Sequence, residues 1–221
     1  MAKYGMVVDL NRCVRCRTCY VVCKKELNVL AHPRDDEHPY EYYPLRYIEW
    51  EWGEYPTVRR GFIPTHCMHC EDPICMAFCP VDAITQRSDG IVIIDKERCN
   101  ECGVCAAICP YGAIYIDWQG RAGGCDFCAA RLDAGGVTKC VEECPAGARV
   151  VGDLDDPKSK ITKLVASGVA KPLLLKGVKN TRVYYIPSHN EADWDKLESN
   201  EEFQKSLAKR ERDLPPVKGV L

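Results

Sequence analysis

Short apolar stretches with β-branched residues predict strands near the start of the chain. Tyr4–Asp9 is one such stretch and precedes a turn, so it is expected to form a strand. Residues 48–52 alternate apolar and acidic side chains, which is the periodicity of a half-buried strand. Gly53-Glu54 predicts a turn after them, and Thr57–Ile63 is expected to return as a second strand. The pattern therefore predicts a hairpin in this part of the chain.

The middle of the chain predicts a second, shorter hairpin over Ala83–Asp95. Residues 84–85 and 91–94 are its expected strands, and Ser88-Asp89-Gly90 is its expected turn. A further strand is expected over Ala113–Trp118.

Residues 151–221 contain no cysteine and carry a different pattern. Lys158–Ser167 predicts a helix that ends at Gly168, and Arg182–Ile186 predicts a short strand. Glu201–Arg212 is expected to be a charged helix with two apolar residues on one face. The tail has too few apolar residues for a core of its own, so we expect it to wrap over the rest of the chain or over a partner subunit.

The amino-acid composition adds a second kind of evidence, because cysteine is unusually frequent, with 16 residues in 221. All of them fall into four quartets of closely spaced residues. The quartets are Cys13, Cys16, Cys19 and Cys23; Cys67, Cys70, Cys75 and Cys79; Cys99, Cys102, Cys105 and Cys109; and Cys125, Cys128, Cys140 and Cys144. The second quartet has the spacing C-x2-C-x4-C-x3-C, the third has C-x2-C-x2-C-x3-C, and a proline follows each.

The third quartet, with its proline, has the spacing that bacterial two-cluster ferredoxins use to hold 4Fe–4S clusters. Three cysteines on a tight loop can reach three corners of one cube, whereas the fourth points away and binds the neighbouring cube. The second and third quartets therefore predict two cubes that share their ligands. One cube is expected on Cys67, Cys70, Cys75 and Cys109, and the other on Cys79, Cys99, Cys102 and Cys105.

Two other uses of cysteine compete with iron–sulfur ligation. Disulfide frameworks are common in secreted cysteine-rich chains, but here every cysteine belongs to a quartet with ligand spacing. A zinc-stabilised interaction module is the stronger alternative, because C-x2-C pairs also bind zinc. Zinc sites usually combine two separated pairs, which differs from a run of C-x2-C-x2-C-x3-C-P. An iron and sulfide assay, or a brown absorption band, would separate the two.

The first and fourth quartets complete the set. The first has the spacing of the third, but Lys24 replaces the proline after its fourth cysteine. The fourth has the spacing C-x2-C-x11-C-x3-C and is followed by Pro145. The lead-in VDLNRC before the first quartet parallels IDKERC before the third, and this internal repeat indicates duplication of a ferredoxin half.

Charge and hydropathy argue against several classes of protein. The net charge is −2 and the pI is about 6.2, so no basic footprint for nucleic acid is present. No apolar run approaches the ~20 residues of a membrane span. The first residues, MAKYGMVVDLNRC, contain neither an apolar signal core nor a twin-arginine motif. We therefore expect assembly in the cytoplasm, with a final location there or outside as the passenger of a partner with a twin-arginine signal.

Two features beside the quartets have open roles. The insertion between the first two quartets is rich in aromatic residues, so its hairpin either covers the clusters or docks a partner, since Trp and Tyr are enriched at interfaces. His66 and His69 flank Cys67 and Cys70, where imidazoles can hydrogen-bond cluster sulfurs. Histidines in such positions are more often surface neighbours, which is how we interpret these two. Neither is needed as a ligand, because four cysteines per cube are available.

The chemistry that these residues predict is electron transfer. The cysteines supply four cubes with no ligand left over, and a cube with four thiolates has no open position for a substrate. The chain contains no G-x-G-x-x-G fingerprint, P-loop or serine nucleophile elbow, and we predict no catalytic residue in it. Four cubes in so short a chain must lie close together and form a wire, whose donor and acceptor lie outside the chain.

In order and spacing, the quartets resemble the four-cluster iron–sulfur subunit of molybdopterin oxidoreductases, the electron-transfer (beta) subunit of the dimethyl sulfoxide reductase family. The resemblance covers roughly Tyr4–Pro187 and includes the missing proline after Cys23 and the segments GDLDDPKSK and RVYYIP. Relatives include polysulfide and thiosulfate reductases, respiratory arsenate reductase and pyrogallol–phloroglucinol transhydroxylase. The aromatic insertion is especially similar to the transhydroxylase beta subunit, which however carries fewer cubes than the sixteen cysteines of this chain supply.

The resemblance implies an α+β fold of two interleaved two-cluster ferredoxin-like modules with short β-hairpins and helices, plus an extended C-terminal tail. It also implies how the outer quartets pair, although spacing alone permits quartets one with two and three with four. One cube would be held by Cys13, Cys16, Cys19 and Cys144, and another by Cys23, Cys125, Cys128 and Cys140. The implied regions are 1–24 with 112–150 (outer module), 25–63 (insertion), 64–111 (inner module) and 151–221 (tail).

The resemblance further implies a large molybdopterin catalytic subunit as partner, with molybdenum or tungsten, in a heterodimer or a larger complex. A membrane-anchor subunit or a soluble redox partner would complete the electron path, and no contact with nucleic acid is expected. The catalytic partner would act on a hydroxylated aromatic, arsenate or a sulfur compound. A stand-alone polyferredoxin is the alternative, and the cysteine-free tail and aromatic insertion argue against it. The native mass of the purified complex would separate the two.

Overall fold

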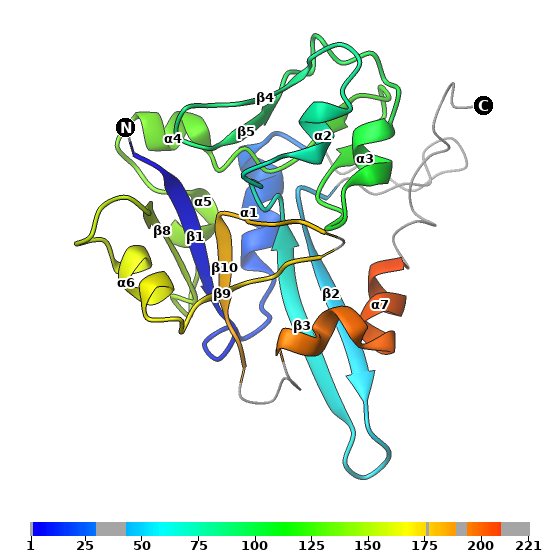
Figure 1. The fold of residues 1–221 in the computed structure, drawn as a ribbon, viewed down its shortest axis with the longest axis vertical. Helices are drawn as coiled ribbons and strands as arrows, with labels where there is room; N and C mark the ends of the chain where they lie inside the picture. The colour runs from blue at the N-terminus through cyan, green and yellow to red at the C-terminus, as the bar shows by residue number, and fades with distance from the viewer. Residues whose placement is uncertain (1, 30–42, 176, 189–193, 209–221) are drawn as a thin grey trace.

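The main sheet joins strands from the two ends of the chain in a computed structural model (Figure 1). The structure describes residues 2–29, 43–175, 177–188 and 194–208. The strand order is β8-β1-β10-β9, with β8 at Arg149–Asp153, β1 at Tyr4–Asp9, β10 at Val183–Ile186 and β9 at Lys171–Pro172. The strands predicted over Tyr4–Asp9 and Arg182–Ile186 are confirmed. The structure adds their pairing, because β1 is parallel to β10 and antiparallel to β8.

β1 is buried on both of its faces. Met6, Val7 and Val8 are each at most 1% exposed, which explains why this run is continuously apolar instead of alternating. α6 (Lys160–Ala166) packs against β1 and places Ile161 in one core cluster with Val7. The predicted helix in this region is therefore confirmed, two residues shorter at its start and one at its end.

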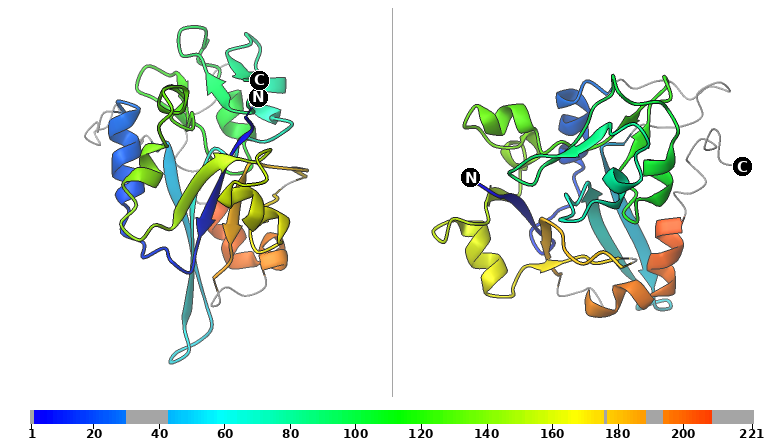
Figure 2. Two further views of the ribbon diagram at one scale, coloured as in Figure 1. Left: turned by 90° about the vertical axis from the view of Figure 1, so that its left-hand side faces the viewer. Right: turned by 45° about the horizontal axis from the view of Figure 1, so that its top comes forward.

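The predicted long hairpin is confirmed as β2 (Leu45–Trp52) and β3 (Arg59–His66), whose turn projects beyond the body of the molecule (Figures 1 and 2). Trp50 lies opposite Gly61, where the indole leaves no room for a Cβ. α7 (Glu201–Ala208) covers the pair, because the ring of Phe203 meets Trp50 edge to face at 5.1 Å. Trp50 is therefore buried within this chain, at 4% exposure, and is not available for docking a partner.

Two short hairpins lie among the cysteines. β4 (Ile84–Gln86) pairs with β5 (Val92–Ile94), as predicted, and β6 (Tyr115–Ile116) pairs with β7 (Ala122–Gly123). The strand expected over residues 113–118 is wrong at both ends. It stops because the Asp117 carboxylate accepts hydrogen bonds from the amides of residues 119 and 121, which forms a turn instead.

Five short helices carry or adjoin cysteines: α1 (Thr18–Glu26), α2 (Ile74–Ala77), α3 (Val104–Ile108), α4 (Ala129–Asp133) and α5 (Lys139–Glu142). α1 packs against α5, and α2 packs against α3. α2, α3 and α5 end before a Cys-Pro pair, because proline disfavours helical backbone in the residue before it. α1 instead runs through Cys23 to Glu26, since Lys24 does not interrupt it.

The cysteine-free segment after residue 150 is built into the body of the molecule. β10 lies between β1 and β9, and Trp194 at the start of a 3-10 helix (Trp194–Ser199) donates its indole N–H to the carbonyl of Pro172 at 3.1 Å. The predicted helix over Glu201–Arg212 is found to Ala208, and its last four residues lie outside the described part of the chain, as do residues 30–42 of the insertion. Among the described helices none is long and apolar enough to cross a membrane.

Candidate iron–sulfur centres

The C-x2-C loops of all four quartets share one backbone feature. The residue before the second cysteine has a positive φ in each: Arg15 at 58°, His69 at 45°, Glu101 at 64° and Phe127 at 57°. Non-glycine residues adopt this left-handed conformation rarely, and strained backbone of this kind clusters at functional sites. Alternation of right- and left-handed residues turns successive amide N–H groups towards one point, which makes the concave nest that many iron–sulfur sites use.

The structure brings three cysteines of the first quartet together with the last cysteine of the fourth. Cys13, Cys16, Cys19 and Cys144 line one cavity. The hydroxyl of Tyr47 lies 3.4 Å from the sulfur of Cys19, and the amide of Ala148 donates to the sulfur of Cys144 at 3.3 Å. Burial raises the pKa of the Cys13 thiol, and the nearby thiols of Cys19 and Cys144 add to the effect.

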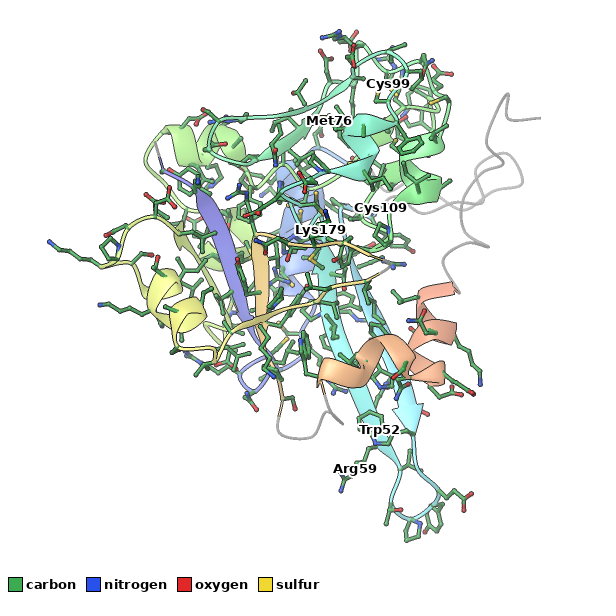
Figure 3. All side chains as sticks on the ribbon, in the orientation of Figure 1. Trp52, Arg59, Met76, Cys99, Cys109 and Lys179 are labelled. Carbon is green, nitrogen blue, oxygen red and sulfur yellow. The ribbon has the colours of Figure 1, made fainter. Side chains whose placement is uncertain are left out.

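A second cavity gathers the last cysteine of the second quartet with three of the third. Its cysteines are Cys79, Cys99, Cys102 and Cys105. The amide of Ala83 donates to the sulfur of Cys79 at 3.2 Å, and the amide of Ala122 donates to that of Cys99 at 3.4 Å. Burial, followed by the thiols of the other three cysteines, raises the pKa of Cys105 to about 12. Cys109, the fourth member of this quartet, lies away from Cys99 at the other end of α3 (Figure 3).

The remaining eight thiols form two further groups of electrostatic neighbours. Burial raises the pKa of Cys67 well above its usual range, and the thiols of Cys75, Cys109 and Cys70 raise it further. Burial also raises the pKa of Cys23, with added effects from Cys140 and Cys128, and the pKa of Cys125 rises by burial and by its neighbours Cys23 and Cys140. We call the two groups that contain Cys13 and Cys23 the outer groups, and the two that contain Cys67 and Cys105 the inner groups.

A shared helix and electrostatic neighbours across the groups indicate that they lie in one series. Cys19 and Cys23 both lie on α1 and belong to different outer groups. The thiol of Cys67 is among the causes that raise the pKa of Cys125, and Cys105 is among those that raise the pKa of Cys75. The order is therefore outer, outer, inner, inner along the molecule.

The raised pKa values describe thiols without iron. Burial raises the pKa of Cys70 and Cys128 to about 11 and that of Cys75 to about 12. Iron binds the thiolate form, so loading of the groups would displace these protons, which is the usual coupling of metal binding to pH.

Two of the four groups of thiols line a cavity. Such an arrangement suits a cube, in which each of four thiolates binds a different iron.

The interpretation of His66 and His69 as surface neighbours is wrong. Both are 1% exposed, and the ring of Phe127 packs edge to face against His69 at 4.2 Å. His69 Nδ1 accepts the amide N–H of Val92 at 3.0 Å, so the neutral ring carries its proton on Nε2. Burial lowers the pKa of His66 to about 3 and that of His69 well below its usual range, and neither Nε2 has a hydrogen-bond partner among the described residues.

Sequence reasoning also missed Arg149, the first residue of β8. Its guanidinium is buried and lines the cavity of Cys13, Cys16, Cys19 and Cys144. The available signal was an arginine at the start of the otherwise apolar run RVVG, directly after the Cys-Pro turn of the fourth quartet.

Comparison with known proteins agrees with this geometry. Residues 58–154, which hold the last three quartets, match the family model of the 4Fe–4S dicluster domain. The chain is 34% identical to the B subunit of the anaerobic dimethyl sulfoxide reductase of Escherichia coli, over 74% of this chain and 80% of that one.

Two further relatives have other substrates in their names. The chain is 32% identical to the arsenate respiratory reductase iron–sulfur subunit of a Shewanella species, over 84% of this chain and 97% of that one. It is 36% identical to the B subunit of the polysulfide reductase of Wolinella succinogenes, over 78% of this chain and 86% of that one. The chain therefore belongs to the family of iron–sulfur B subunits of dimethyl sulfoxide reductase-type oxidoreductases.

Proposed function

We propose that this chain is an electron-transfer subunit that holds four 4Fe–4S clusters and connects a molybdopterin catalytic subunit to an external electron donor or acceptor. The observation that carries the proposal is the gathering of sixteen thiols into four groups in series. Membership in a family of iron–sulfur subunits supports the same function.

The ligand assignment that we propose follows the four groups. The outer clusters take Cys13, Cys16, Cys19 and Cys144, and Cys23, Cys125, Cys128 and Cys140. The inner clusters take Cys67, Cys70, Cys75 and Cys109, and Cys79, Cys99, Cys102 and Cys105. When bound, the clusters would supply one-electron chemistry, and the chain's own part is to hold them in sequence and to exclude solvent between them.

Two interleaved ferredoxin-like modules are the architecture that we propose for these groups. β4, which follows the second quartet, pairs with β5, which leads into the third, and α2 packs on α3. β8, which follows the fourth quartet, pairs in the same way with β1, which leads into the first, and α5 packs on α1. This correspondence supports pairing of the outer quartets with each other over pairing in series.

Metal analysis of anaerobically purified protein tests the cofactor content. About 16 iron and 16 sulfide per chain are expected for four cubes, and a brown absorption band should accompany them. Zinc in place of iron, or iron for two cubes only, would contradict the proposal.

The proposed partner is tested separately by the native mass of the complex. Relatives named as the B subunit or the iron–sulfur subunit of a reductase favour a multi-subunit assembly. Co-purification with a large subunit that contains molybdenum or tungsten would support the proposal, whereas a monomer that exchanges electrons with several soluble enzymes would favour a polyferredoxin. Whether the partner's substrate is a hydroxylated aromatic, arsenate or a sulfur compound is read from its activity.

A further inference from the structure

Arg149 is a buried cation between the two outer groups of thiols. It begins β8, lies opposite Val8 of β1, and is 4% exposed. An arginine side chain stays charged in proteins, because its pKa lies far above neutral. Placing such a charge inside the fold is unfavourable unless an opposite charge or a set of hydrogen bonds balances it.

The described residues supply no such balance. Arg149 Nη1 contacts the sulfur of Met6 at 3.4 Å and that of Cys140 at 4.0 Å, and both are weak acceptors. Nη2 has no partner, and no carboxylate in the described part of the chain forms an ion pair with this guanidinium. The cation is thus surrounded by thiols and aromatic side chains.

Arg149 lies next to both outer groups. It lines the cavity of the first group, which holds Cys13 and Cys144. It also contacts Cys140 of the second group, with 4.0 Å between Nη1 and the sulfur. The same guanidinium therefore faces ligands of two different proposed clusters.

We propose that Arg149 supplies the positive charge that balances the two outer clusters and raises the reduction potential of both. The inference rests on the proposed function, because the balancing anions are the thiolate-bound clusters. Addition of one electron makes a cluster more negative, so a nearby buried cation stabilises the reduced state over the oxidised one. Net charge near a cluster is one of the properties that set its potential.

Other arginines beside the first outer group are poorly placed for this role. Arg12, Arg15 and Arg17 are exposed, so solvent and salt screen their charges. Arg17 also forms an ion pair with Glu49 at 3.2 Å, which offsets its charge. Arg12 thus provides a matched control, an arginine next to Cys13 that is exposed where Arg149 is buried.

The experiment is a potentiometric titration followed by EPR, on the full chain with its clusters, using dithionite as reductant. The variants are Arg149→Met, which removes the charge at similar length, Arg149→Lys, which retains it, and Arg12→Met. Signals are assigned to the outer clusters by their loss in Cys19→Ser and Cys140→Ser.

In Arg149→Met, the reduction equilibria of both outer clusters should shift by about tenfold or more towards the oxidised state. A tenfold shift corresponds to about 59 mV for a one-electron couple. The midpoint potentials of the outer clusters in Arg149→Lys should stay closer to those of the wild type, and Arg12→Met should shift them less than Arg149→Met does. The midpoint potentials of the inner clusters should be unchanged. Unchanged outer midpoints in Arg149→Met, equal shifts of all clusters, or an equal shift in Arg149→Lys would overturn the proposal.

If Arg149→Met fails to load iron, the cluster content of Arg149→Met and Arg149→Lys is compared instead. Loss of outer clusters in Arg149→Met but not in Arg149→Lys would support charge balance, whereas loss in both would show that the shape of arginine is what matters. Failure of the proposed function is distinguishable, because wild-type protein would then lack the four-cluster iron content before any variant is compared.

Discussion

The outer and inner groups of thiols share a left-handed residue in their C-x2-C loops but differ in the side chains that surround them. A left-handed residue precedes the second cysteine in both regions, for example Arg15 and Glu101. The outer groups are placed around a buried cation, Arg149, whereas the inner region holds two buried neutral imidazoles, His66 and His69. The φ at this loop position therefore recurs with the spacing of the cysteines, whereas the charge of the buried side chains around the thiols differs between the two regions.

Removal of iron should have the largest effect and tests whether either region is stable by itself. Without iron, the sixteen cysteines no longer cross-link segments that are distant in sequence. We therefore expect the apo chain to lose its cooperative unfolding transition. Near-UV circular dichroism and thermal melting after anaerobic chelation measure this. A cluster-free chain with native-like spectra and a sharp transition would show that the strands alone hold both regions.

A packing defect under α7 should lower the free energy of unfolding without changing the iron content of the outer or the inner groups. Phe203→Ala removes the ring that covers Trp50, and truncation of a fully buried phenylalanine costs about 3–5 kcal/mol. We expect a lower free energy of unfolding with unchanged iron content. Glu201→Ala on the exposed face of the same helix is the control, and it should have little effect. Selective loss of outer or inner clusters in Phe203→Ala would instead link this core to one region.

The buried imidazole of the inner region has a structural role that can be tested by a matched pair. His69→Leu leaves the amide of Val92 without its acceptor, which costs about 1–3 kcal/mol. His69→Asn should recover part of this loss, because asparagine tolerates a positive φ and its side-chain oxygen can accept a hydrogen bond. The measurement is the unfolding midpoint of iron-loaded protein. Equal midpoints for the two variants would contradict a role for the acceptor.

The smallest expected effect is the difference in stability between two variants that each lose one ligand, one in the inner region and one in the outer region. Cys102→Ser and Cys128→Ser should each damage one cube, because serine oxygen is a poorer match for iron than thiolate sulfur. The outer group joins residues 23 to 140, whereas the inner one joins residues 79 to 105. Loop-closure entropy grows with the length of the closed segment, so we expect Cys128→Ser to lose about 1 kcal/mol more.

Iron analysis and EPR identify which cube is lost in each of these variants, and thermal melting measures the difference. Four intact cubes with unchanged spectra in Cys102→Ser would reject the ligand assignment. Greater destabilisation by Cys102→Ser than by Cys128→Ser would contradict the expectation that the outer group contributes more to stability.

Prediction from the sequence succeeded where the pattern is local. β1 was predicted with its observed bounds, and the hairpins at residues 45–66 and 84–94 were predicted within a few residues, because alternation and turn residues determine them. The strand predicted over residues 113–118 is present only at Tyr115–Ile116, and the Asp117 turn ends it. The interpretation of His66 and His69 as surface neighbours failed for a different reason, because tertiary packing, which includes the ring of Phe127 against both imidazoles, buries them.

By itself, the sequence determined the ligand type, the four quartets and the alternation of short elements, because these depend on residues a few positions apart. Only the tertiary structure brought Cys144 to Cys13, set β10 beside β1 and buried Arg149 among thiols. Spacing constrains the path of one loop, but it carries no information on which distant loop shares its cavity. That choice comes from strand pairing and helix packing, whose free energy is summed over many weak contacts.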